Sequence, residues 1–148
     1  MSFLRLLPFA LPLVLLGCGA PADASKTVVR GKLLDNGKPF VVDATKLKLP
    51  KGASLPPGTN PLQIQFIPEE PGEMYLTTIN DPATGGFELT GSDGRGIKLG
   101  KYKVSIQLNT GPGTPDGLGG KYSPEKTPFK VEVKDGEEIV IDVNKPKG

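Results

Sequence analysis

The chain has 148 residues, with 20 glycines, 16 prolines, one cysteine, and no tryptophan or histidine. Its formal net charge is only +2, and basic residues alternate with acidic ones, which argues against nucleic-acid binding. Because histidine is absent, Ser-His-Asp and Cys-His catalytic arrangements and histidine-containing zinc sites are excluded. The single cysteine cannot form an internal disulfide.

The first residues have the three parts of a secretory signal peptide. Arg5 supplies a cation, Leu6 to Leu16 is apolar, and small residues follow. This apolar stretch contains two prolines and is shorter than the roughly 20 residues that a membrane-spanning helix needs. We therefore expect it to be cleaved.

The end of this stretch, Leu15-Leu16-Gly17-Cys18, resembles the bacterial lipobox. The resemblance implies that residues 1–17 are a lipoprotein signal peptide, that cleavage falls between Gly17 and Cys18, and that Cys18 carries a diacylglycerol. Further acylation, for example with palmitate, would give stable anchoring. The expected location is the cell membrane or outer membrane, after export. The alternative is an ordinary signal peptide with a chance cysteine.

Residues 18–25 are small and polar, which predicts a flexible tether, and order should begin near Lys26. Thr27 to Leu34 is predicted as a strand, and Asn36-Gly37 is the pair that a type I′ hairpin turn favours. The chain then returns as a short edge segment over Pro39 to Val42.

Two stretches rich in glycine and proline have little periodicity. We expect Asp43 to Asn60 to be a long surface loop, with a candidate short strand at Lys46 to Leu49, and Asn109 to Gly120 to be a second excursion.

Alternating apolar and polar residues predict the remaining strands. In the strongest of them Tyr102, Val104, Ile106 and Leu108 face the core, and Lys101, Lys103, Ser105 and Gln107 face solvent. The predicted strands are Leu62 to Ile67, Met74 to Ile79, Gly86 to Thr90, Lys101 to Leu108, Phe129 to Val133 and Ile139 to Val143. About seven strands at turn-marked spacing predict an all-β fold, an antiparallel β-sandwich of the transthyretin-like or Ig-like kind, over residues 26–148.

Several of these segments resemble the carboxypeptidase regulatory-like domain. They are Gly31 with the turn Asp35-Asn36-Gly37-Lys38-Pro39, then Gln65-Phe66-Ile67-Pro68, Gly86-Phe87, Leu99-Gly100-Lys101-Tyr102-Lys103-Val104, Lys121-Tyr122-Ser123, Thr127-Pro128-Phe129-Lys130-Val131 and Asp135-Gly136. The resemblance implies a transthyretin-like sandwich of the kind found in small planctomycete-type lipoproteins, with no catalytic residues. The long Asp43 to Asn60 insert departs from that family's pattern.

Other motifs have simpler explanations. Ser123-Pro124-Glu125-Lys126 matches the S-x-x-K motif of penicillin-recognising enzymes, but its third motif is Lys126-Thr127-Pro128 where glycine is needed. Acidic residues gather at the turns near Glu69, Asp93 and Asp135 without the spacing of a calcium loop, so solvated turns are favoured over a metal site. A lysine–asparagine cross-link of the Cna-B type between Lys32 and Asn144 is a further alternative.

The predicted function is that of a non-catalytic module. Phe66, Phe87, Tyr102 and Phe129 fall on core positions, which leaves Tyr75 and Tyr122 as the candidate ligand surface. We expect no enzymatic activity and no cofactor. We expect a membrane contact through lipid on Cys18 and a structural or protein-binding role in the cell envelope, using strand edges or the two loops. The alternative is a carbohydrate-binding module that uses the two tyrosines.

Overall fold

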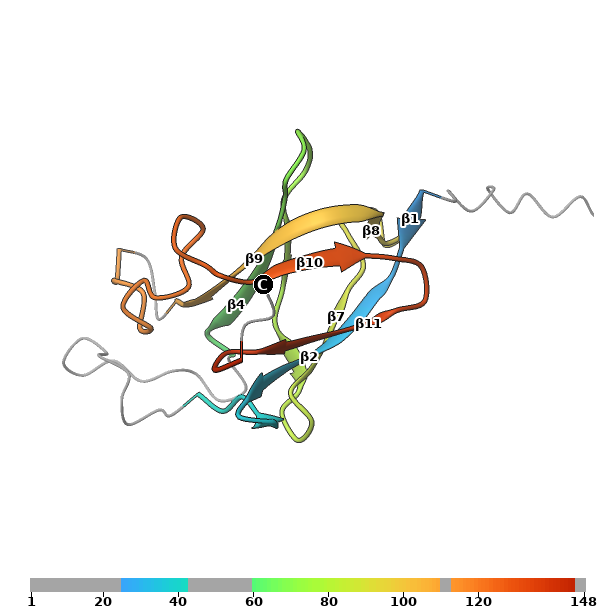
Figure 1. Cartoon of the computed structure of the whole chain (residues 1–148). Helices are drawn as coiled ribbons and strands as arrows, with labels where there is room; N and C mark the ends of the chain where they lie inside the picture. Colours follow the sequence, from blue (N-terminus) through green and yellow to red (C-terminus); the bar gives the residue numbers. More distant parts are fainter. Residues whose placement is uncertain (1–24, 43–59, 110–112, 146–148) are drawn as a thin grey trace, which may run out of the picture.

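A computed structural model describes residues 25–42, 60–109 and 113–145 of the chain. Every regular element in these ranges is a β-strand, so the expectation of an all-β fold is confirmed (Figure 1). No helix that is long and apolar enough to cross a bilayer occurs within these ranges.

The first predicted strand forms as two segments, β1 (Lys26–Thr27) and β2 (Val29–Asp35), with a break at Val28. The turn after β2 has positive φ angles at Asn36 (52°) and Gly37 (79°), as the Asn-Gly pair predicts. It leads into the short strand β3 (Lys38–Pro39), which pairs with the end of β2.

The middle of the chain forms β4 (Leu62–Pro68), β5 (Tyr75–Thr77), β6 (Ile79–Asp81) and β7 (Gly86–Leu89). Burial along β4 alternates as predicted, because every second side chain faces the core. The expected single strand from Met74 to Ile79 is interrupted, since the chain bends between β5 and β6 and changes its pairing partner there from β4 to β7.

The last part of the chain forms β8 (Ile97–Lys98), β9 (Gly100–Leu108), β10 (Lys130–Val133) and β11 (Glu138–Asp142). The short strand β8 was not predicted. It pairs with β1 and so fastens the start of the domain to the start of β9.

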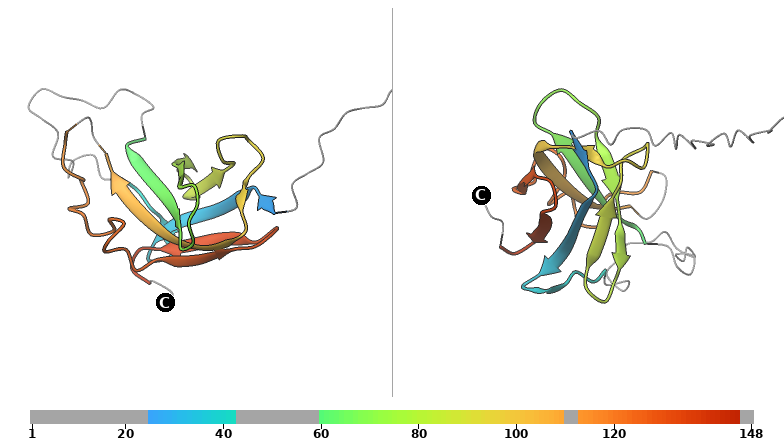
Figure 2. Two further views of the ribbon diagram at one scale, coloured as in Figure 1. Left: turned by 90° about the horizontal axis from the view of Figure 1, so that it is seen from above. Right: turned by 90° about the vertical axis from the view of Figure 1, so that its right-hand side faces the viewer.

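Two larger sheets contain most of the described strands, in the orders β10-β9-β4-β5 and β11-β2-β7-β6. Because β5 and β6 are successive parts of one bent segment, the two sheets are continuous on that side. The result is a curled arrangement that resembles half a barrel (Figure 2). On the opposite side, β10 and β11 are both edge strands, and they are not paired with each other.

One strand pair corrects the expectation of a wholly antiparallel architecture. Among the described pairs, β11 and β2 run parallel, with Ile139 opposite Gly31 and Ile141 opposite Leu33. The other described pairs are antiparallel. The reason is the connection after β10: the chain crosses from one sheet to the other and joins β2 instead of turning back on β10.

Both sheets contribute to a single core. Phe66 of β4 is fully buried, and its ring centroid lies 6.0 Å from that of Phe87 on β7 and 6.1 Å from that of Tyr102 on β9. The prediction that Phe66, Phe87, Tyr102 and Phe129 are core residues is confirmed.

Ser105 is fully buried, although the alternation on β9 placed it with the solvent-facing lysines. Its hydroxyl donates a hydrogen bond of 3.2 Å to the Oε1 atom of Gln65, whose amide donates to Gln107. A row of polar side chains across β4 and β9 therefore covers this position.

Gly31 has a specific packing role at the centre of β2. A β-carbon added there would lie 2.4 Å from the carbonyl oxygen of Ile139 and 2.4 Å from the ring of Phe87. The Phe87 ring occupies the space that a side chain would need, and this requirement explains why glycine is present in the middle of a strand.

Candidate functional site

The two predicted lipidation and cleavage residues, Gly17 and Cys18, lie outside the described residues. So do the predicted tether before Ser25 and most of the Asp43 to Asn60 loop, including its candidate short strand. These predictions stay predictions.

Tyr75 and Tyr122 are not a surface platform. Tyr75 is 7% exposed and Tyr122 is 6% exposed, so the expectation that they form a ligand surface is wrong. The Tyr75 ring packs 6.3 Å from that of Tyr102, whereas the Tyr122 ring packs 5.2 Å from that of Phe129. The two tyrosines therefore fill different parts of the core.

The hydroxyl groups of Tyr122 and Tyr102 make structural hydrogen bonds. The Tyr122 hydroxyl donates to the carbonyl oxygen of Val143, and the Tyr102 hydroxyl donates to that of Lys98. Burial, with a smaller effect of neighbouring Tyr75, raises the pKa of Tyr102 to about 12. Tyr102 therefore stays protonated at neutral pH.

The second predicted loop is partly described, and Asp116 organises it. The Asp116 carboxylate accepts hydrogen bonds from the backbone amides of Leu108, Leu118 and Gly120. The amide of Gly117 in turn donates to the carbonyl oxygen of Leu108. This part of the Asn109 to Gly120 excursion is thus fixed to the end of β9.

The S-x-x-K sequence forms a turn, in which the backbone amides of Lys126 and Thr127 donate to the Ser123 carbonyl oxygen. The pKa of Glu125 is lowered by its own backbone amide and then by the Ser123 hydroxyl. The Ser123 hydroxyl therefore has a role within the turn.

The residues of the lysine–asparagine cross-link have separate partners. Lys32 forms an ion pair of 3.0 Å with Glu138, while the Asn144 amide donates to the Asp35 carboxylate. The structure therefore does not bring Lys32 and Asn144 together as that alternative requires.

Acidic turn residues also have local partners. A hydrogen bond from the Thr84 hydroxyl, followed by one from the Ala83 amide, lowers the pKa of Asp81. Lys26 lowers the pKa of Asp93 through an ion pair of 2.6 Å. Within residues 25–42, 60–109 and 113–145, no group of three or more acidic, histidine or cysteine side chains could hold a metal ion.

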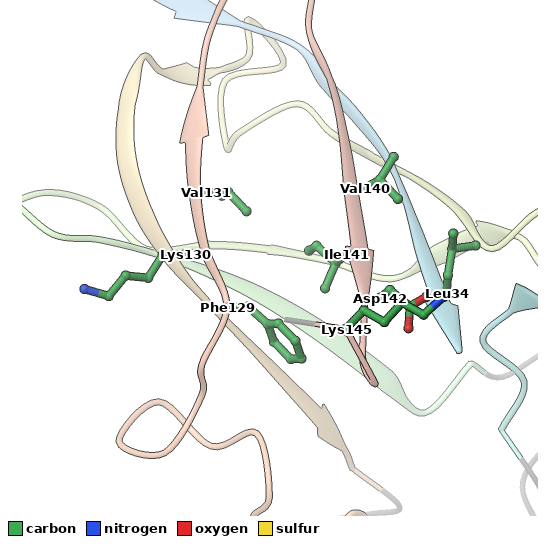
Figure 3. Close-up of a pocket in the computed structure, with 8 residues that line it drawn as sticks. All are labelled: Leu34, Phe129, Lys130, Val131, Val140, Ile141, Asp142 and Lys145. Carbon is green, nitrogen blue, oxygen red and sulfur yellow. The ribbon is translucent and has the colours of Figure 1, made fainter. Parts of the chain in front are cut away.

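The clearest surface feature is a seam between β10 and β11. The two strands are joined by a short turn, which is fastened to β1 where the Thr27 hydroxyl donates to Asp135. Beyond the turn, and among the strands that the structure describes, each of the two pairs only with its own sheet. Figure 3 shows Val131 and Ile141 pointing into the space between the strands, and Lys130 pointing away from it.

A cavity of about 220 Å³ lies at this seam. Its lining is largely apolar, with Phe129 and Ile141 buried beneath it and Val140 47% exposed. The lining residues are Leu34, Phe129, Lys130, Val131, Val140, Ile141, Asp142 and Lys145.

The backbone of both strands presents hydrogen-bonding groups to the seam. The Phe129 carbonyl oxygen accepts from Val104 on β9, and the Val143 amide donates to Leu34 at the end of β2. Because alternate residues of a strand direct their backbone groups to opposite neighbours, those of Lys130 and Glu132 on β10 and of Val140 on β11 face the seam. No described strand pairs with these groups, so they form sheet edges of the kind that accept another strand.

Charged side chains lie at the open end of the seam, which is the end farther from the turn between β10 and β11. The Asp142 carboxylate holds the Asn-Gly turn, because it accepts hydrogen bonds from the amides of Asn36, Gly37 and Asn144. Lys130 lies directly opposite Lys103 on β9, and it forms a 3.4 Å ion pair with Glu69.

Sequence reasoning missed the seam as a site. Phe129 to Val133 and Ile139 to Val143 were both predicted as strands, with the turn Asp135-Gly136 between them. The pairing of the two strands with different sheets has no effect on the alternation of apolar and polar residues in either strand.

No family model matches the chain, and neither a curated protein nor a solved structure matches it.

Proposed function

We propose that this protein is a lipid-anchored lipoprotein of the bacterial cell envelope whose β-domain is a non-catalytic, protein-binding module. The single observation that supports binding is the pair of unpaired edge strands, β10 and β11, which face each other across an apolar cavity. Sheet edges bind extended peptides through main-chain hydrogen bonds, and apolar pockets add specificity.

The proposed location rests on the sequence Leu15-Leu16-Gly17-Cys18. Residues 1–17 would be the signal peptide, and lipid on Cys18 would hold the domain at a membrane through residues 18–25. The first described strand, β1, lies at the closed end of the seam, next to the turn between β10 and β11 (Figure 1). A tether that enters at β1 would leave the open end of the seam directed away from the membrane.

The proposed fold family is the carboxypeptidase regulatory-like, transthyretin-like sandwich. The positions that support it are Gly31, packed against Phe87, and the Asn36-Gly37 turn, held by Asp142. In this chain, that architecture would include the parallel pairing of β11 with β2 and the bend between β5 and β6.

The carbohydrate-binding alternative loses its proposed platform, because Tyr75 and Tyr122 are buried in separate parts of the core. No other observation favours a sugar ligand.

Location is tested by the intact mass of the protein purified from its native membrane, compared with a Cys18→Ser variant. The proposal predicts a mature chain that begins at Cys18 and carries lipid, and it predicts an unlipidated variant. A chain cleaved elsewhere and free of lipid would contradict the anchoring.

Binding is tested by a photo-crosslinking residue placed at Val140, beside the seam, in cells that make the full-length protein. The matched control carries the same residue at Leu76, an exposed apolar position on β5 that is 55% exposed. Protein adducts at Val140 that exceed those at Leu76 are expected. Equal labelling at both positions, or adducts with glycan alone, would contradict a protein-binding role.

A further inference from the structure

Resting on the proposed function, we infer that the partner contributes a single extended strand, which inserts between β10 and β11 and joins the two sheets into a closed barrel. The occupant is a segment of a protein partner about as long as β11, which has five residues. It has apolar side chains at alternate positions and an acidic side chain near the open end of the seam.

The backbone argument defines the conformation of the occupant. Lys130 and Glu132 direct their backbone groups toward the seam from one side, and Val140 does so from the other. An extended chain can pair with both edges because its own groups alternate between two neighbours. A helix satisfies its backbone groups internally and would leave these edges unpaired.

The side-chain argument defines the inward face of the occupant. Phe129, Val131 and Ile141 border the seam from the core side, and Phe129 and Ile141 are only 3% exposed. An incoming strand directs every second side chain toward this floor. Apolar residues at those positions would extend the existing core, whereas polar residues would be buried without partners.

Charge complementarity defines the outward face near the open end. Lys130 is already paired with Glu69 and points away from the seam (Figure 3), so Lys145 is the other cation among the lining residues of the cavity. The carboxylate among these lining residues, Asp142, is held by three backbone amides. An acidic side chain on the incoming strand would balance the charge of Lys145.

The inference is tested without knowledge of the natural partner. A five-residue strand of alternating valine and threonine, with one glutamate beside Lys145, is appended to the full-length protein after Gly148 through a flexible turn. Tethering makes insertion an intramolecular event at high effective concentration. The control tail has the same length, but two of its residues are replaced by proline, which removes backbone donors that the ladder needs.

The readout is amide hydrogen exchange at Lys130, Glu132 and Val140. New hydrogen bonds should slow exchange at these amides by roughly tenfold or more relative to the proline tail, and the melting temperature should rise. Unchanged exchange at all three amides, or protection at β5 instead, would overturn the inference.

A second arm separates this inference from the proposed function. Slowed exchange with the tethered strand, combined with no protein adducts at Val140 in cells, would support the seam as a strand acceptor and contradict the binding role. Protein adducts at Val140 without slowed exchange would support the binding role and overturn strand insertion.

Discussion

The two sides of the curled sheet use strand edges in opposite ways. On the closed side, the segment containing β5 and β6 pairs first with β4 and then with β7, so one chain segment belongs to both sheets. On the open side, β10 and β11 are also consecutive, yet each pairs with a different sheet and neither pairs with the other. The segment containing β5 and β6 thus links the two sheets through the chain itself, whereas β10 and β11 face each other across the seam without pairing.

The largest expected effect comes from breaking the closed side at Phe66. Phe66→Ala removes a fully buried ring that contacts Phe87 and Tyr102 across the core. We expect a loss of about 3–5 kcal/mol in the free energy of unfolding. Chemical denaturation of the variant and the wild type measures this loss, and a cost below about 1 kcal/mol would contradict the assigned core.

Gly31→Ala tests the packing at the centre of β2, the strand that pairs with β11. The new methyl group would clash with the Ile139 carbonyl oxygen and with the Phe87 ring. We expect destabilisation of about 1–3 kcal/mol, measured by denaturation. Gly37→Ala is an informative companion, since it has a positive φ of 79° but open space around it, and its cost should come from backbone strain alone.

Asp142→Asn tests the hydrogen bonds by which the Asp142 carboxylate holds the Asn36-Gly37 turn at the open end of the seam. Partial desolvation is the largest influence on Asp142 and acts to raise its pKa. The amides of Asn144, Gly37 and Asn36 and the charge of Lys145 together outweigh it, so the pKa of Asp142 lies below its ordinary value of 3.8. A depressed folded pKa contributes stability that is present above the unfolded value and is lost as pH falls through the folded one.

Wild-type protein should therefore lose stability as pH falls below about 4, and Asp142→Asn should show a shallower loss. Denaturation midpoints at pH 7 and pH 3 provide the measurement. The variant should be less stable than wild type at pH 7, and the difference should narrow at pH 3, because Asp142 is then largely protonated in the unfolded state and partly protonated in the folded state. Parallel pH profiles would refute this role for Asp142.

The smallest expected effect is at the seam itself. Val140→Thr changes a side chain that is 47% exposed on β11 and keeps its β-branched shape. We expect a change in unfolding free energy of less than about 0.5 kcal/mol. A large cost in the isolated protein would mean that Val140 is already part of a closed core, which would remove the contrast between the two sides.

Local patterns were sufficient to predict most strands and much of the core. The alternation from Leu62 to Ile67 and the Asn36-Gly37 pair each depend on a few neighbouring residues, and both predictions are confirmed. The parallel pairing of β11 with β2 could not be predicted, because it depends on where the chain crosses between sheets. The bend between β5 and β6 changes the pairing partner within a continuous run of extended residues, so it also left no clear signal.

Errors at the candidate site have a related cause. Tyr122 lies in a stretch without periodicity, and its burial follows from a hydrogen bond between its carbonyl oxygen and the Ile106 amide, which holds that segment beside β9. Ser105 occupies a polar position in the alternation but is covered beside Gln65. The seam itself results from the order of the strands in the two sheets, which no single residue type predicts.

The most direct test of the central claim is native-state amide hydrogen exchange on the protein without a partner. The account predicts fast exchange at Lys130, Glu132 and Val140, whose amides face the seam, and slow exchange at their neighbours Val131 and Ile141, whose amides bond within the sheets. Uniformly slow exchange along both β10 and β11 would show that the seam is already closed, and would contradict a strand-accepting edge.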